Sequence, residues 1–289
     1  MSSAFKSKVS VFEIATKRII DLLESGVAPW KKSWSSSIGL SPMNYDSKRC
    51  YSGINFFLLS MLDDPYFMTF NQVKKNGGSI KKGAKGEVVF YWQWTYYDAN
   101  GKLTKSEDDA ERKIPTLKYY RVFNAPDIEG INFDYPKPEP LRPNEKYEAC
   151  EELIGSTGAK IEYSDNGQPF YSPTEDFIHM PVIGRFENSD AYYSTLLHEL
   201  GHWTGADSRL NRDLSGLFGS NKYSKEELIA ELTSAFVCAE LKLDNDAVTS
   251  DHASYLAGWI KVLKGDSKLV ITASSAAQKA ANYILSNRN

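Results

Sequence analysis

The residues most able to do chemistry lie in one short motif. His198, Glu199 and His202 form a His-Glu-x-x-His pattern in a segment with the character of a helix. Positions four apart on a helix share one face, so both imidazoles can point at a single ion. Glu199 follows the first histidine and is placed to act on a water bound to that ion. The pattern is typical of zinc-dependent hydrolases, in which this glutamate is the general base.

A catalytic zinc site usually takes a third protein ligand and leaves one position for water. Glu227 and Glu231 are the candidates, because they lie one turn apart in a helix expected over 225–243. The zincin pattern favours Glu227 as the ligand and Glu231 as the acceptor for the second N–H of a ligand histidine. The reverse assignment stays open, and the glutamates also suit a plain charge cluster near a helix N-terminus. The expected ion is Zn²⁺, with another divalent metal as the alternative.

Several elements must position these side chains. Asn188 or Ser189 is a plausible N-cap for the histidine helix, and Ser224 with Glu227 fits a capping box for the next one. Gly201 suggests that another helix packs closely against the motif. Short strands are expected over 161–163 and 169–181, and the segment 170–181 is a candidate edge strand for pairing with an extended peptide.

Composition narrows the class of protein. The chain has 289 residues, of which 42% are apolar and 25% are charged, as in folded globular proteins. No apolar run is long enough for a membrane span, and the N-terminus lacks the apolar core of a secretion signal. Cys50, Cys150 and Cys238 are widely spaced and odd in number, which favours a reducing compartment over a cysteine-bound zinc. We therefore expect a cytoplasmic protein without a membrane partner.

The front half of the chain combines cations with aromatic side chains. Residues 1–135 hold 19 Lys and Arg against 15 Asp and Glu, whereas the remainder holds 15 against 22. Single-stranded nucleic acid is bound by grooves of this mixed kind, with cations on phosphates and aromatic rings under bases. The same residues also suit an aromatic strand core with a solvated lysine face. The candidates for DNA contact are Trp30, Lys31, Lys32, Trp34, Tyr51, Lys81, Lys82, Lys85, Tyr91, Tyr119 and Arg121, with Trp92 and Trp94 among the neighbouring aromatics.

A proline-rich stretch divides the chain. Residues 135–143 contain four prolines and favour an extended linker. We predict an α+β protein of two domains, over 1–135 and 144–289, joined by a linker at 136–143. The first should contain helices near 9–25 and 54–62 and strands near 88–94 and 116–124. The second should be mainly helical around the short strands.

The sequence resembles the ArdC-type antirestriction proteins of plasmids and other mobile elements over nearly its whole length. In the front half the resemblance lies in Gly26-Val-Ala-Pro-Trp-Lys-Lys-Ser-Trp34, Tyr51-Ser-Gly-Ile-Asn55, Gly77-Gly-Ser-Ile-Lys-Lys-Gly-Ala-Lys-Gly86 and Tyr120-Arg-Val-Phe-Asn124. In the back half it lies in His198-Glu-Leu-Gly-His-Trp-Thr-Gly205, Ser208-Arg-Leu-Asn-Arg212 and Glu226-Glu-Leu-Ile-Ala-Glu-Leu232.

This resemblance implies a domain that binds single-stranded DNA, with Asn55 among its contacts, followed by a zincin-like metallopeptidase domain. The implied role is to protect incoming DNA from host restriction. Protection by covering single strands, by cleaving a host protein, or by both remains open. The alternatives are a non-proteolytic DNA-binding protein whose metal is structural or regulatory, and a hydrolase that acts on DNA.

Overall fold

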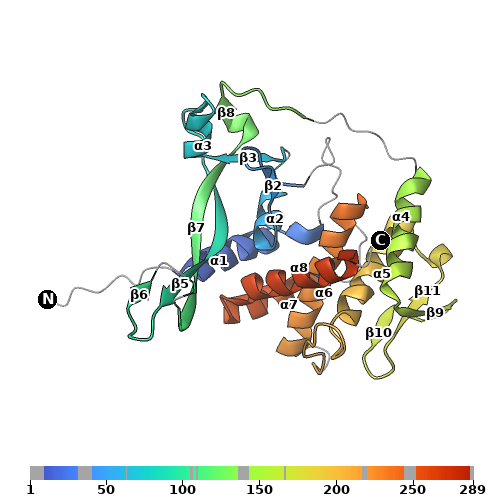
Figure 1. The fold of residues 1–289 in the computed structure, drawn as a ribbon. Coiled ribbons are helices and arrows are strands. Elements are labelled where there is room, and N and C mark those ends of the chain that lie inside the picture. The colour runs from blue at the N-terminus through green and yellow to red at the C-terminus, as the bar shows by residue number, and fades with distance from the viewer. Residues whose placement is uncertain are drawn as a thin grey trace.

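The computed structural model describes residues 10–31, 41–62, 64–104, 107–108, 110–135, 143–165, 167–216, 220–243 and 252–286. Within these ranges the chain is an α+β protein with a sheet-rich first part and a mainly helical second part (Figure 1). The predicted linker at 136–143 lies almost wholly outside the described residues, so the predicted domain boundaries stay a prediction.

The first domain is built on a six-stranded sheet with the order β2-β1-β3-β7-β5-β6. Its two long strands, β5 and β7, form an antiparallel hairpin rich in aromatic and β-branched residues, as expected for strands. The sheet strands are β1 (Met43–Asn44), β2 (Arg49–Cys50), β3 (Tyr66–Thr69), β5 (Glu87–Tyr97), β6 (Leu103–Thr104) and β7 (Arg112–Asn124). The other elements are α1 (Val11–Glu24), η1 (Pro29–Lys31), α2 (Ile54–Leu59), α3 (Phe70–Lys75), β4 (Ser79–Ile80), η2 (Ala125–Asp127) and β8 (Ile128–Glu129).

The second domain combines a group of helices with a three-stranded sheet of the order β10-β11-β9, which packs against α5. Strand β11 lies in the centre, antiparallel to β10 and parallel to β9. Of the segment 170–181, only β10 is therefore an edge strand, and the expectation that β11 could also receive a peptide is wrong. The elements are α4 (Pro143–Thr157), β9 (Lys160–Ser164), β10 (Phe170–Ser172), β11 (Phe177–Pro181), η3 (Ile183–Arg185), α5 (Ser189–Trp203), α6 (Asn221–Leu241), α7 (His252–Gly265) and α8 (Leu269–Ser286).

One hydrophobic core crosses between the two parts. Ala15 and Ile19 of α1 belong to the same buried cluster as Phe236 of α6 and Trp259 of α7. In Figure 1, α1 and α2 lie between the long hairpin and the C-terminal helices. Residues 10–31 therefore complete the core of the helical domain as well as covering the sheet.

The start of α6 differs from the sequence prediction. Its N-cap is Ser220, whose side chain accepts a hydrogen bond from the backbone N–H of Tyr223. The helix therefore begins about one turn earlier than a cap at Ser224 would allow. Glu227 consequently lies in the second turn and does not form a capping box. Its side chain has no capping role and faces the histidine helix instead.

Candidate metal centre

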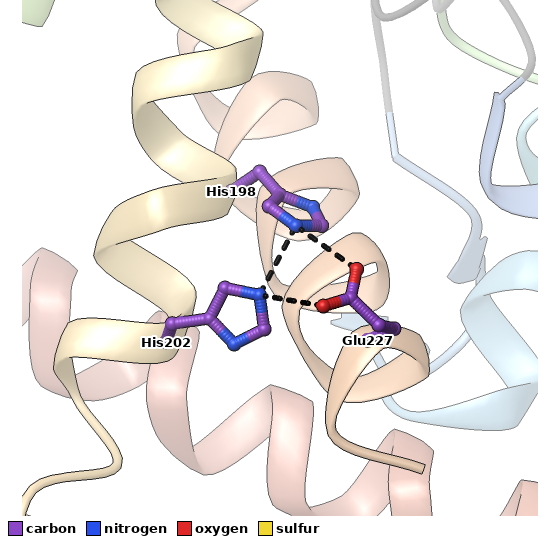
Figure 2. A group of neighbouring side chains, drawn as sticks. All are labelled: His198, His202 and Glu227. Carbon is purple, nitrogen blue, oxygen red and sulfur yellow. Dashed lines mark hydrogen bonds and ion pairs between the residues drawn. The ribbon is translucent and has the colours of Figure 1, made fainter. Parts of the chain in front are cut away.

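Helix α5 carries both histidines on one face. The Asn188 side chain caps the helix by accepting a hydrogen bond from the Ala191 N–H, as the sequence predicted. The Nε2 atoms of His198 and His202 lie 3.2 Å apart (Figure 2). The four-residue spacing thus converges two nitrogen donors on one point, which is the first requirement of a metal site.

Glu227 of α6 supplies the third donor. Its two carboxylate oxygens lie 3.6 Å from Nε2 of His198 and 3.4 Å from Nε2 of His202. One donor atom from each of the three residues lies within 4.8 Å of the others (Figure 2). Tetrahedral ligands bound at zinc-like distances would be about 3.4 Å apart. The donor set therefore fits a small divalent ion.

The other nitrogen of each imidazole faces a second glutamate. Glu231 lies 3.9 Å from Nδ1 of His198, and Glu226 lies 3.4 Å from Nδ1 of His202. A carboxylate in this position orients the ring and makes it a better ligand. Because Glu227 faces both Nε2 atoms and Glu231 faces an Nδ1 atom, the geometry favours Glu227 as the ligand and Glu231 as its supporting carboxylate.

Two residues of this centre were missed as functional by sequence reasoning. Glu226 is buried, and Arg212 binds it through two nitrogens, one of them at 2.7 Å. Arg212 also donates to the Gly201 carbonyl at 2.7 Å and to the Thr204 hydroxyl at 2.8 Å. A single guanidinium thus ties the C-terminal end of α5 to α6 beside His202. The only sequence signal for it was its place in the Ser208–Arg212 motif.

Close packing of α5 on α6 makes this arrangement possible. A Cβ atom added at Gly201 would lie 3.0 Å from the Ala230 Cα atom, a distance that side chains hardly tolerate. The glycine inside the motif therefore allows the two helices to approach, as expected from the sequence. Without that approach Glu227 could not face both histidines.

The donors open into a cavity of about 430 Å³. Glu199 lines the same cavity and is itself buried, as are the neighbouring ligands for most of their surface. Phe170 and Tyr171 of the edge strand β10 form part of the cavity wall. A carboxylate, a metal-donor set and an open strand edge therefore share one pocket.

The charges within the cluster reinforce one another. Burial lowers the pKa of His202, but contacts with Glu226 and Glu227 outweigh it and raise that pKa to about 10. Burial alone would raise the pKa of Glu227, yet its hydrogen bonds to His198 and His202 bring it well below the usual range. In the metal-free protein the cluster therefore holds a protonated imidazole next to an ionised carboxylate.

Metal binding is consequently expected to depend on pH. A metal ion needs neutral imidazole, so it must displace the proton that His202 retains up to about pH 10. In the metal-free protein the charged His202 stabilises the fold fully below its unfolded pKa of about 6.5, and that contribution is lost as pH rises through the folded pKa. The apparent Zn²⁺ affinity should therefore rise about tenfold per pH unit for each proton released, as measured by chelator competition between about pH 6.5 and 9.

The His179→Gln variant is a suitable control for that titration. The His179 ring bonds to Ser164 and to the Gln168 carbonyl, away from the donor cluster. The His179→Gln variant should show the same dependence of apparent Zn²⁺ affinity on pH as the wild type. A wild-type affinity that stays flat over this range would contradict the charge arrangement described above.

The residues predicted to bind DNA are scattered in the structure. Trp30 is fully buried and packs edge-on against Phe57 and Trp259. Asn55 uses its side-chain amide to hold both backbone groups of Phe90. Trp30 is therefore inaccessible to a nucleic acid and is corrected to a structural position, whereas Asn55 is partly exposed and its role as a DNA contact stays a prediction. The sequence motif around Trp30 shows its lysines and tryptophans but not the distant helix that covers it.

The remaining DNA candidates fall into separate groups. Lys82 and Lys85 are exposed in the glycine-rich turn, and Lys81 there donates to the Pro126 carbonyl. Tyr51 is half-buried against Phe67. Lys32 and Trp34 lie outside the described residues, as does the side chain of Lys31.

The β5–β7 register separates three further candidates. Tyr119 and Arg121 pair with Phe90 and Val88, whereas Tyr91 pairs with Lys118. Directly paired residues share a face and successive residues alternate, so Tyr91 lies on the face opposite Tyr119 and Arg121. The candidates therefore do not form a single binding surface.

Comparison with known proteins agrees with this architecture. Residues 10–123 match a family described as the N-terminal domain of anti-restriction factor ArdC, and residues 148–276 match a family described as zincin-like metallopeptidase. The fold and the donor set thus define a two-domain protein with a zincin-like domain and a divalent-metal site. No helix among the described residues is long and apolar enough to cross a membrane.

Whole-chain relatives are more specific. The crystal structure of the antirestriction ArdC protein from plasmid R388, metal-free, is 33% identical with a TM-score of 0.79, covering 97% of this chain and 98% of that one. The same protein has also been solved in an Mn(II)-bound form, with 32% identity, a TM-score of 0.79 and the same coverage. An uncharacterized protein y4eC of Sinorhizobium fredii NGR234 is 34% identical over 96% of this chain and 92% of its own length. The chain belongs to the ArdC antirestriction family.

In two longer relatives the segment similar to this chain is only part of the protein. The DNA primase TraC of Escherichia coli is 36% identical over 94% of this chain, which spans only 27% of that primase. A second TraC primase of Escherichia coli is 36% identical, and the chain spans 20% of it.

Proposed function

We propose that this protein protects incoming DNA from host restriction by binding single strands in the cytoplasm and by zinc-dependent hydrolysis of peptide bonds. One observation carries the hydrolytic part: the donors of His198, His202 and Glu227 lie within 4.8 Å of one another in a pocket that Glu199 also lines. The single-strand part rests on family membership and on the basic, aromatic first domain. A host protein is the proposed substrate of the metal centre.

The proposed mechanism assigns each side chain a task. His198, His202 and Glu227 would hold Zn²⁺, which when bound polarises the scissile carbonyl and acidifies a water. Glu199 accepts the proton from the attacking water and passes it to the leaving amine. Glu231 and Glu226 keep the two imidazoles oriented from behind. Strand β10 offers an open edge beside the centre, along which an extended peptide can add as a strand.

The experiment that tests the hydrolytic proposal removes one carboxylate without disturbing the donors. The Glu199→Gln variant is assayed for metal content, for peptide hydrolysis and for protection of unmodified DNA in a restricting host. Loss of hydrolysis with metal retained supports the assignment.

A salt titration tests the DNA-binding proposal. Lys81, Lys82 and Lys85 are exposed in one turn, and each phosphate contact they make would release a counterion. Replacing all three by Ala should weaken binding of an oligothymidylate and reduce the slope of log K against log salt by about 2. Fluorescence anisotropy with a labelled oligonucleotide provides the measurement.

The control is Lys160→Ala, which removes an exposed lysine from β9 of the second domain. That variant should bind with the wild-type slope. If the triple variant also keeps the wild-type slope, the strand does not run over the glycine-rich turn.

A further inference from the structure

A second cavity lies between the two domains. Its volume is about 690 Å³, and its walls come from β5, β7, the segment that follows α5, and α8. It is separate from the metal pocket, but Arg212 links the two, because this arginine lines the second cavity and pairs with Glu226, which lines the metal pocket. The hydrolytic mechanism uses none of the side chains on the β5 wall.

Two tryptophans form that wall. Trp92 and Trp94 are 44% and 49% exposed, although they belong to a largely apolar row on one face of β5. The preceding members of the row, Val88 and Phe90, are buried in the shared core. This row of side chains therefore begins in the core and ends in two exposed indole rings. A large exposed aromatic surface inside a cavity is typical of a binding site.

These indoles stand apart from the other tryptophans of the described chain. Trp30, Trp203 and Trp259 are buried and serve the core. Trp92 packs on one side against Phe12 of α1, with ring centroids 5.9 Å apart, yet 44% of Trp92 and 49% of Trp94 remain exposed. A ligand with a flat ring would cover them.

The charge of the cavity indicates an anionic ligand. Its lining contains Arg209, Arg212 and Lys279 and no acidic residue. The two arginines are already paired, with Asp176 and Glu226 respectively. Lys279 is exposed on α8 and forms no ion pair with the acidic residues that the structure describes. An ammonium near two indoles is the combination that binds a phosphate beside a stacked base.

We propose that this cleft binds a single DNA strand, with unstacked bases lying on Trp92 and Trp94 and a phosphate at Lys279. The proposal rests on the single-strand binding proposed above and assigns a binding site to the strand. The strand would then contact both domains and would pass Arg212, the residue that holds Glu226 behind His202. An apolar peptide is the competing occupant, but it would leave the Lys279 ammonium unmatched.

The test measures binding of a labelled oligothymidylate by fluorescence anisotropy. Trp94→Ala should weaken binding about tenfold, because a stacked base is lost. Ser275→Glu, which places a carboxylate at an exposed position of α8 in the cleft, should weaken it by a similar factor. Lys279→Gln should reduce the slope of log K against log salt concentration by about 0.7. The two α8 variants change exposed positions, so they keep the test valid if Trp94→Ala folds poorly.

The control lies on the opposite face of the same hairpin. Gln93 and Lys118 are exposed on that face, so Gln93→Ala and Lys118→Gln change neighbouring positions of the hairpin away from the cleft. Both should bind like the wild type. Weak binding by these two variants, with normal binding by the cleft variants, would overturn the proposal and place the strand on the other face.

The outcomes separate this inference from the proposed function. If the wild type binds no single-stranded DNA, both fail. If the wild type binds and all cleft variants bind equally well, only the cleft assignment fails. Cleft variants that bind DNA normally but lose peptide hydrolysis would show that the cleft receives the protein substrate, which also overturns the proposal.

Discussion

The Glu199→Gln variant is expected to bind its metal ion like the wild type and to lose peptide hydrolysis by about 10²- to 10⁴-fold. The amide has nearly the size of the carboxylate, so the buried position beside the donors is filled and their geometry is kept. It cannot accept a proton from the attacking water, and the step that Glu199 serves has no substitute in the pocket. Glu226, Glu227 and Glu231 are all engaged with the histidines. Metal content and hydrolysis of a peptide library are the two measurements.

A matched control is Glu187→Gln, which changes an exposed glutamate just before α5. It should retain full hydrolysis. Substantial hydrolysis by Glu199→Gln would remove this residue as the base. The same pair of variants, tested for protection of DNA in a restricting host, separates two modes of action: protection that survives without hydrolysis means that occupying DNA is sufficient.

Loss of Arg212 is expected to have the second large effect. In Arg212→Ala, the buried carboxylate of Glu226 loses its only arginine partner among the described residues, and the Gly201 carbonyl loses a donor. Breaking a buried ion pair on one side costs about 3–5 kcal/mol of folding free energy. Glu226 would also be free to turn away from His202, so the affinity for Zn²⁺ should fall roughly 10- to 100-fold. Denaturant unfolding and chelator competition measure the two effects.

A double variant distinguishes structural from metal-directed effects. Adding Glu226→Gln to Arg212→Ala removes the unpaired charge and should recover much of the stability. It also removes the carboxylate behind His202, so the metal affinity should remain low. Arg185→Ala, at an exposed position of η3, serves as a surface control. Unchanged metal affinity in Arg212→Ala would show that Glu226 does not support the site.

The local parts of the centre were predictable because they follow helix geometry. The His198 and His202 pair, the Asn188 cap and the turn between Glu227 and Glu231 all depend on spacing within one helix. Glu226 was not predictable in the same way, since adjacent residues on a helix point about 100° apart. Only the position of α6 relative to α5 shows that two neighbouring glutamates can both reach histidine rings from different sides.

Long-range burial was the main source of error in the first domain. The Pro29–Trp34 segment has the composition of an exposed loop, yet Trp30 is enclosed by Phe57 and by Trp259 of a helix more than two hundred positions away. The local sequence pattern does not indicate this partner. The strand character of β5 was readable from its composition, but which of its faces is covered depends on the positions of α1 and the C-terminal helices.

The core that passes from α1 to α7 has a consequence for how this chain is inherited. A fragment beginning near 144 would uncover Trp259 and Phe236, and a fragment ending near 135 would uncover Ile19 and Trp30. Either piece, moved alone into another gene, would expose an apolar surface that is buried in the full chain and that favours aggregation. Recombination is therefore expected to move both halves together and to avoid breakpoints between them. The match of 94% of this chain to one part of a much longer primase agrees with the two halves being kept together.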